Sequence, residues 1–135
     1  MNKREIYITE RDMERLQALI DIGGKKDAAY LERLEEELDR AKVVDPRDIP
    51  HDVVTMNSSV LVKDLDTNEE KTFVLVFPGK ANMTENAISI LAPVGTALIG
   101  YKEGDVIDWE VPAGTKRIQI IKVIYQPERN GNYDG

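Results

Sequence analysis

The hydrophobic positions of the first 45 residues recur at helical spacing, whereas the later ones gather in short runs. One stripe has steps of three and four residues: Met13, Leu16 and Ile20. This spacing places side chains on a single helix face and predicts a helix over residues 10–21. Thr9 and Asp12 resemble a capping box at its start, in which the hydroxyl accepts a hydrogen bond from a first-turn N–H.

A second stripe predicts a helix over residues 28–42. Its members are Leu31, Leu34, Leu38 and Ala41. Gly23 and Gly24 separate the two stripes and favour a helix end, because glycine readily takes the left-handed conformation there. Two helices joined by a tight turn indicate an antiparallel hairpin, here a short coiled coil. At 1.5 Å per residue, each arm would be about 18–24 Å long.

The pattern after residue 45 predicts an antiparallel sheet. The runs that indicate strands cover residues 60–63, 72–77, 87–91, 106–111 and 117–125. Residues 96–100 are long enough for a short helix closed by Gly100. The apolar phase of the last run shifts from Ile118 and Ile120 to Ile121 and Val123, which predicts a β-bulge. The fold class is therefore α+β.

Prolines and polar residues divide the chain into four predicted parts. We expect a helical hairpin over residues 1–45 and a linker leading into the sheet over 46–58. The sheet domain would occupy residues 59–127, and a loose polar tail would follow over 128–135.

Composition narrows the classes of function. The chain has 135 residues, a net charge of −7, one histidine and no cysteine. These counts exclude thiol catalysis, cysteine-ligated metals and multi-histidine metal sites. The acidic balance argues against direct nucleic-acid binding. The apolar runs are too short to span a membrane, and the first residues lack the apolar core of a secretory signal, so we expect a cytoplasmic protein. Nothing indicates an oligomer, so we expect a monomer.

Few residues suggest chemistry. His51 beside Asp52 could act as a base, but a turn residue is the simpler interpretation. The expected hairpin tip contains Asp21, Gly23, Gly24, Lys25, Lys26 and Asp27. Two carboxylates at a tip could share Mg²⁺, but a helix cap at Asp27 and a solvated Asp21 are favoured. We therefore predict no catalytic residue, no metal site and no cofactor.

Two segments stand out: Pro-His-Asp-Val-Val-Thr-Met-Asn-Ser over residues 50–58 and Ala-Pro-Val-Gly-Thr-Ala-Leu-Ile-Gly-Tyr-Lys-Glu-Gly-Asp over residues 92–105. They resemble the Gre family of bacterial transcript cleavage factors, and its Rnk (regulator of nucleoside diphosphate kinase) group in particular. The resemblance implies a coiled coil followed by an FKBP-like domain that docks on RNA polymerase at the rim of its secondary channel. The implied contact residues are Ser89, Leu91, Ala92, Pro93, Val94 and Thr96. Ala92 stands where the longer factors usually have serine.

The length of the hairpin separates this chain from the longer factors, whose acidic tips are implied to help bind a second Mg²⁺ at the polymerase active centre. Every ten residues missing from an arm shorten its reach by about 15 Å. We therefore predict a non-enzymatic regulator that binds polymerase and competes with long Gre factors. Three alternatives remain: a short-armed cleavage factor, a protein that binds nucleoside diphosphate kinase directly, and a prolyl isomerase. The last would need an aromatic pocket, whereas Trp109, Phe73, Phe77 and Tyr125 fit a core better.

Overall fold

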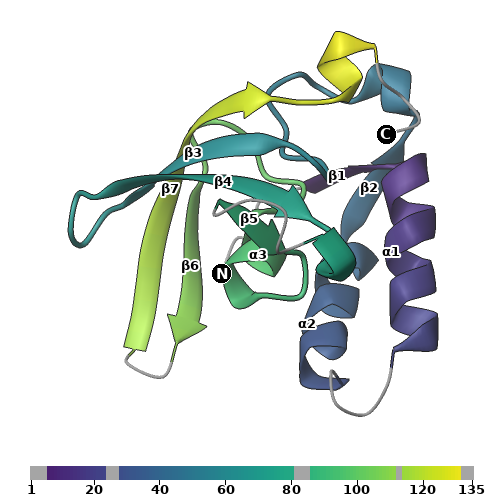
Figure 1. The fold of residues 1–135 in the computed structure, drawn as a ribbon, viewed down its shortest axis with the longest axis horizontal. Helices are drawn as coiled ribbons and strands as arrows, with labels where there is room; N and C mark the ends of the chain where they lie inside the picture. The colour runs from purple at the N-terminus through teal and green to yellow at the C-terminus, as the bar shows by residue number, and fades with distance from the viewer. Residues whose placement is uncertain (1–5, 24–27, 81–85, 112–113, 132–135) are drawn as a thin grey trace.

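The computed structural model describes residues 6–23, 28–80, 86–111 and 114–131. A helical hairpin descends beside a curved sheet, and a short helix lies within the curve of the sheet (Figure 1). The helices and strands are, in chain order, β1 (Ile6–Thr9), α1 (Glu10–Ile22), α2 (Ala28–Asp39), β2 (Ala41–Val44), β3 (Ser59–Asp64), β4 (Glu70–Val76), β5 (Ala87–Ser89), α3 (Pro93–Leu98), β6 (Val106–Val111) and β7 (Gly114–Tyr125). The described residues also form the 3₁₀ turns η2 (Pro46–Asp48), η3 (Pro78–Lys80) and η4 (Glu128–Asn130).

Helix α1 begins as predicted and ends one residue later than predicted. The Thr9 hydroxyl accepts a hydrogen bond from the Asp12 N–H at 3.0 Å, which confirms the cap. The left-handed conformation expected at the helix end is wrong for Gly23, which has an extended backbone with φ −66°, and Gly24 lies outside the described residues. A Cβ atom at Gly23 would lie 2.0 Å from the Leu31 side chain. Close packing between the two helices therefore favours glycine at this position.

The second helix is shorter than predicted. Helix α2 ends at Asp39, and Ala41 begins strand β2 instead of continuing the helical stripe. Strands β1 and β2 pair in parallel, with Ile6 opposite Ala41 and Thr9 opposite Val44. The helical stripe of leucines runs into Val43 and Val44, whose β-branched side chains favour a strand when a partner is present. That partner lies more than thirty residues earlier in the chain, so local spacing gave no indication of it.

The larger sheet has the strand order β5-β4-β3-β7-β6. Its neighbours are antiparallel except β4 and β5, which are parallel; the expectation of a wholly antiparallel sheet is therefore wrong at this edge. The predicted bulge in the last strand is confirmed, because the β3–β7 register shifts between Leu61 and Val62 and again between Ser59 and Val60. Helix α3 begins at Pro93, three residues before the predicted start, because proline suits the first position of a helix.

One hydrophobic core joins the hairpin to the sheet. From β1, α1 and α2 it contains Ile6, Ile8, Leu16, Leu34 and Leu38. It also contains Val60, Val62, Leu75, Ile90, Leu98, Ile99, Ile118, Ile120 and Val123 from the sheet and α3. Tyr125, which the sequence placed in a core, is 39% exposed, and the side chain of Trp109 lies outside the described part of the chain. The shared core fixes the direction in which the hairpin leaves the sheet.

The segment after the last strand is ordered against the body of the protein as far as residue 131. Residues Glu128–Asn130 form η4, and Glu128 is only 8% exposed. The prediction of a loose polar segment is therefore wrong for these residues. The Gln126 side-chain amide donates to the carbonyls of Pro50 and Val53, at 2.9 and 2.7 Å. These bonds hold the end of β7 against the segment that leads into the sheet.

Candidate functional site

The predicted contact segment forms a compact corner between β5 and α3. The Ser89 hydroxyl accepts from the Leu91 N–H at 3.0 Å, and the Thr96 hydroxyl donates to the Ile90 carbonyl at 2.6 Å. A Cβ atom at Gly95 would lie 2.2 Å from the Ser89 carbonyl oxygen. Because no other residue fits this space without moving backbone, glycine is required for α3 to approach the strand so closely.

Five of the six predicted contact residues differ in their access to solvent, and the side chain of the sixth, Pro93, lies outside the described part of the structure. Ser89, Leu91, Ala92 and Val94 are half-buried. Thr96 is only 2% exposed, so its hydroxyl shapes the corner from inside. Ala92 precedes the first turn of α3 and provides no side-chain cap. The surface of the corner therefore consists of small and apolar groups.

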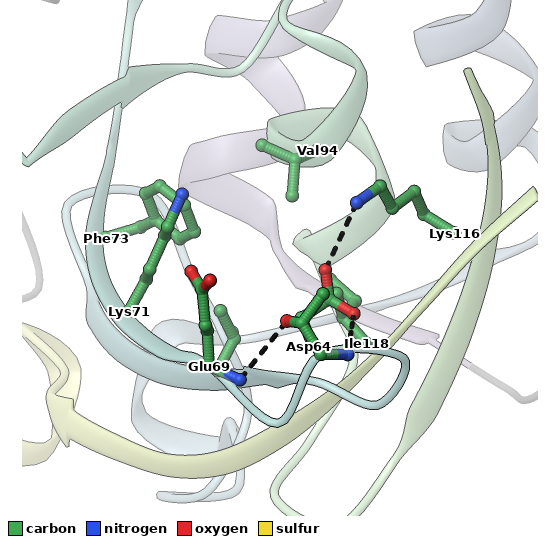
Figure 2. A pocket seen from close by; sticks show the side chains of 9 residues that line it. Asp64, Glu69, Lys71, Phe73, Val94, Lys116 and Ile118 are labelled. Atoms are coloured by element: carbon green, nitrogen blue, oxygen red, sulfur yellow. Dashed lines mark hydrogen bonds and ion pairs between the residues drawn. The ribbon is translucent and has the colours of Figure 1, made fainter. Parts of the chain in front are cut away.

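A cavity of about 290 Å³ opens beside this corner, on the concave face of the sheet (Figure 2). Its apolar lining comes from Val62, Phe73, Val94 and Ile118. Its polar lining comes from Asp64, Thr67, Glu69, Lys71 and Lys116. Val94 of α3 faces the cavity in Figure 2, so the corner and the cavity form one continuous surface.

The charges at the cavity are mixed. Lys116 Nζ lies 3.3 Å from Asp64 Oδ2. Asp64 Oδ1 also accepts from the backbone N–H groups of Asp66 and Thr67. The Asp66 N–H, followed by Lys116 and Thr67, holds the pKa of Asp64 below its usual range. Two lysines and two carboxylates therefore surround an apolar floor without a dominant charge.

The predicted hairpin tip is described only in part. Asp21 is exposed and accepts from the Gln17 side-chain amide at 3.3 Å. Ile22 is 82% exposed and Gly23 follows it, also exposed. Gly24, Lys25, Lys26 and Asp27 lie outside the described residues, so the paired carboxylates and the Asp27 cap remain predictions. Within the described residues, no group of three or more histidine, aspartate or glutamate side chains could hold a metal ion.

Sequence reasoning missed the cavity and the buried polar contacts of Asp12. The cavity collects residues from β3, β4, α3 and β7. The inward positions of the strands are visible as alternating apolar residues, and this alternation could have indicated Val62, Phe73 and Ile118 as neighbours. Asp12 Oδ2 accepts from the Met56 N–H at 3.0 Å. No sequence signal indicates a bond between residues 44 positions apart.

Comparison with known protein families shows the family to which the chain belongs. Residues 49–125 match the family described as "Transcription elongation factor, GreA/GreB, C-term". The chain belongs to the GreA/GreB family. Residues 4–44 match the description "Rnk N-terminus". The resemblance inferred from residues 50–58 and 92–105 is therefore confirmed, and it extends over the hairpin.

Individual relatives agree with this assignment to the GreA/GreB family. The chain is 38% identical over 134 residues to the "Regulator of nucleoside diphosphate kinase" of Escherichia coli K12, covering 98% of each chain. It is 39% identical over 104 residues to transcription elongation factor GreA of Clostridium botulinum strain Hall, covering 74% of this chain and 65% of that factor. Among solved structures, a GreA/GreB elongation factor from Nitrosomonas europaea superimposes with a TM-score of 0.74 at 43% identity. That match covers 91% of this chain and all of the other.

No helix among the described residues is long and apolar enough to cross a membrane. The chain is a Gre-family transcription factor in which a short hairpin precedes the C-terminal family region at residues 49–125.

Proposed function

We propose that this chain binds RNA polymerase at the rim of the secondary channel and regulates transcription without cleaving RNA. The contact surface would consist of Ser89, Leu91, Ala92, Pro93 and Val94. In this proposal the sheet domain is the FKBP-like docking module of the Gre family, and α1 and α2 are its short coiled coil. The protein would act as a monomer in the cytoplasm, without sequence-specific binding to nucleic acid.

The shared core is the observation that carries the proposal. Leu34 and Leu38 of α2 belong to the same core as Leu98 of α3, so the hairpin and the docking corner are parts of one packed unit. Binding through the corner would therefore also fix the direction of the hairpin. Helix α1 has 13 residues, which gives a reach of about 20 Å. A hairpin of this length supports occupation of the channel mouth more than contact with a distant active centre.

Binding to core RNA polymerase tests the proposal. We expect the purified protein to bind, and a long Gre factor to displace it. Ala92→Glu should weaken binding about tenfold or more, which is about 1.4 kcal/mol. It should leave the fold intact, because a carboxylate is tolerated beside a helix N-terminus. Ile124→Glu is the matched control, since Ile124 is 46% exposed and lies on β7. Undetectable binding of the unmodified protein, or equal binding by Ala92→Glu, would reject the proposal.

Transcript cleavage is the second candidate, because Asp21 is exposed at the end of the hairpin helix α1. Its test is the shortening of RNA in stalled elongation complexes. We expect no shortening above the rate of polymerase alone. Shortening that is lost in Asp21→Asn would instead establish a cleavage factor with a short arm.

The name of the Escherichia coli relative raises a third candidate, a direct effect on nucleoside diphosphate kinase. We propose that any such effect is indirect, through transcription. Mixing the two purified proteins tests this view: binding, or a change in kinase rate, would contradict it.

A further inference from the structure

Two buried carboxyl groups meet where the hairpin joins the sheet. Asp12, on the first turn of α1, is 1% exposed. Its Oδ2 accepts from the backbone N–H of Met56 at 3.0 Å, and its Oδ1 accepts from Arg15 at 2.5 Å. The side chain therefore links the hairpin directly to the segment that leads into β3.

The second carboxyl group comes from the opposite end of the chain. Glu128 of η4 is 8% exposed, and its Oε1 accepts from the Thr55 hydroxyl at 2.8 Å. The Thr55 and Ser58 hydroxyl oxygens lie 2.9 Å apart. Asp12 and Glu128 thus bind adjacent residues, Met56 and Thr55. The turn at residues 55–58, in the segment that leads into β3, is therefore bonded to Asp12 of α1 and to Glu128 of η4.

The charges around this turn are unbalanced. Burial raises the pKa of Asp12, and the Met56 N–H and Arg15 only partly oppose this. Burial also raises the pKa of Glu128, the negative charge of Asp12 raises it further, and Thr55 and Arg15 oppose. Arg15 is the cation that both carboxyls share. It also lies 4.9 Å from the centroid of the Phe77 ring.

Within the described part of the chain, the other groups shown to bond at this junction bring no second cation. Thr9, Thr55 and Ser58 contribute neutral hydroxyls. Arg129, adjacent to Glu128, donates to the carbonyls of Ile124 and His51. Two ionised carboxylates would consequently repel each other across a buried junction in which they share the Arg15 guanidinium, and burial makes such repulsion costly.

We propose that Asp12 and Glu128 form a proton-dependent lock, which is firm while the pair holds a proton and loosens the hairpin and η4 when both carboxyls are ionised. This inference concerns the junction and does not depend on which partner the corner binds. The two groups interact, so the proton belongs to the pair rather than to either residue.

The sign of the pH dependence follows from the native state holding protons more tightly than the unfolded chain. The ordinary pKa values are 3.8 for Asp12 and 4.5 for Glu128, and both are raised on folding. The stabilising effect is therefore fully present below these ordinary values. It is lost as pH rises through the raised ones. The lock tightens in acid and loosens toward neutral and alkaline pH.

Two measurements on the full chain test the lock. The first needs no variant: the carboxyl ¹³C shifts of Asp12 and Glu128 are followed by NMR as pH rises. We expect both to titrate above their ordinary values with coupled curves. In the same samples we follow hydrogen exchange of the Met56 amide and correct it for its intrinsic rate. The equilibrium constant for local opening should rise with pH, by about tenfold in total for each unit by which folding raises the pKa of the pair.

The second measurement compares variants that keep the hydrogen bonds. Glu128→Gln and Asp12→Asn retain an oxygen acceptor for Thr55 and Met56, and each should flatten the rise of Met56 opening with pH. Asp21→Asn, at an exposed site on the same helix, is the control and should keep the dependence of the unmodified chain. The lock is disproved if both carboxyls titrate at ordinary values, or if Glu128→Gln and the unmodified protein have parallel pH profiles.

Discussion

Gly100 lies directly against Ile6, so that a Cβ atom at Gly100 would be 2.8 Å from the Ile6 Cβ. The backbone of Gly100 adds two bonds at this crossing. Its carbonyl accepts from the Tyr7 N–H at 3.2 Å, and its N–H donates to the Val54 carbonyl at 2.9 Å. Strand β1 therefore packs on the sheet domain at Gly100, where a side chain would clash with Ile6. A side chain would also strain the backbone there, since φ of Gly100 is +83°.

Gly100→Ala should destabilise the protein by about 2–5 kcal/mol, the sum of left-handed strain and overpacking. Gly104→Ala separates the two effects, because Gly104 has φ +90° but nothing within 4 Å of a Cβ. It should cost only about 1 kcal/mol. Urea unfolding of both variants measures the difference, and equal losses would contradict the role of the Ile6 contact.

Leu34→Ala should reveal that the hairpin and the sheet unfold together. Leu34 is 0% exposed within the shared core, so its truncation should cost about 2–5 kcal/mol. Helical circular dichroism reports mainly on the hairpin, and the fluorescence of the single tryptophan, Trp109 in β6, reports on the sheet. We expect both midpoints to fall together.

Ile22→Ala is the control for this experiment, because Ile22 is 82% exposed. It should change stability by less than about 0.5 kcal/mol. If Leu34→Ala lowered the helical midpoint while the tryptophan transition stayed in place, the hairpin would be an independent unit.

Tyr101→Phe should weaken a polar link between the hairpin and the sheet domain that is separate from the bond between Asp12 and Met56. Arg40, the residue that follows α2, donates to the Tyr101 hydroxyl and to Glu37 Oε2. Burial, together with the charge of Glu37, raises the pKa of Tyr101, so the hydroxyl stays neutral through the physiological range. Removing it should cost about 1–2 kcal/mol. Tyr125→Phe, at a 39% exposed site, should be nearly neutral in the same thermal scans; equal effects would exclude a special role for the Arg40 bond.

Lys116→Ala should have a small effect, because its ion pair with Asp64 is partly exposed. We expect a loss below about 1 kcal/mol that shrinks in high salt. Asp64 has a lowered pKa, so its stabilising contribution is present at neutral pH and disappears as pH falls through the native value. The variant should raise the pKa of Asp64 only partly, since the Asp66 N–H remains; NMR titration of Asp64 measures this, and full return to the ordinary value would contradict it.

The amino-acid sequence by itself determined the local elements and the family. Helix α1 followed from the spacing of Met13, Leu16 and Ile20 and from the Thr9 cap, because these interactions lie within one or two turns. The bulge in β7 followed from a shift in alternation, which directly records the face on which each side chain lies. Two short segments, residues 50–58 and 92–105, were specific enough to indicate the Gre resemblance.

The tertiary structure decided everything that depends on distant partners. Ala41–Val44 became a strand because β1 was available beside it, which overrode a helical stripe. Residues 128–130 are ordered because Glu128 accepts a hydrogen bond from Thr55 on another segment. The bond from Asp12 to Met56, the crossing of Ile6 and Gly100 and the cavity beside Val94 arise only when separate segments pack together. Local propensity is set by neighbours in sequence, whereas burial and charge depend on neighbours in space, which only the folded chain defines.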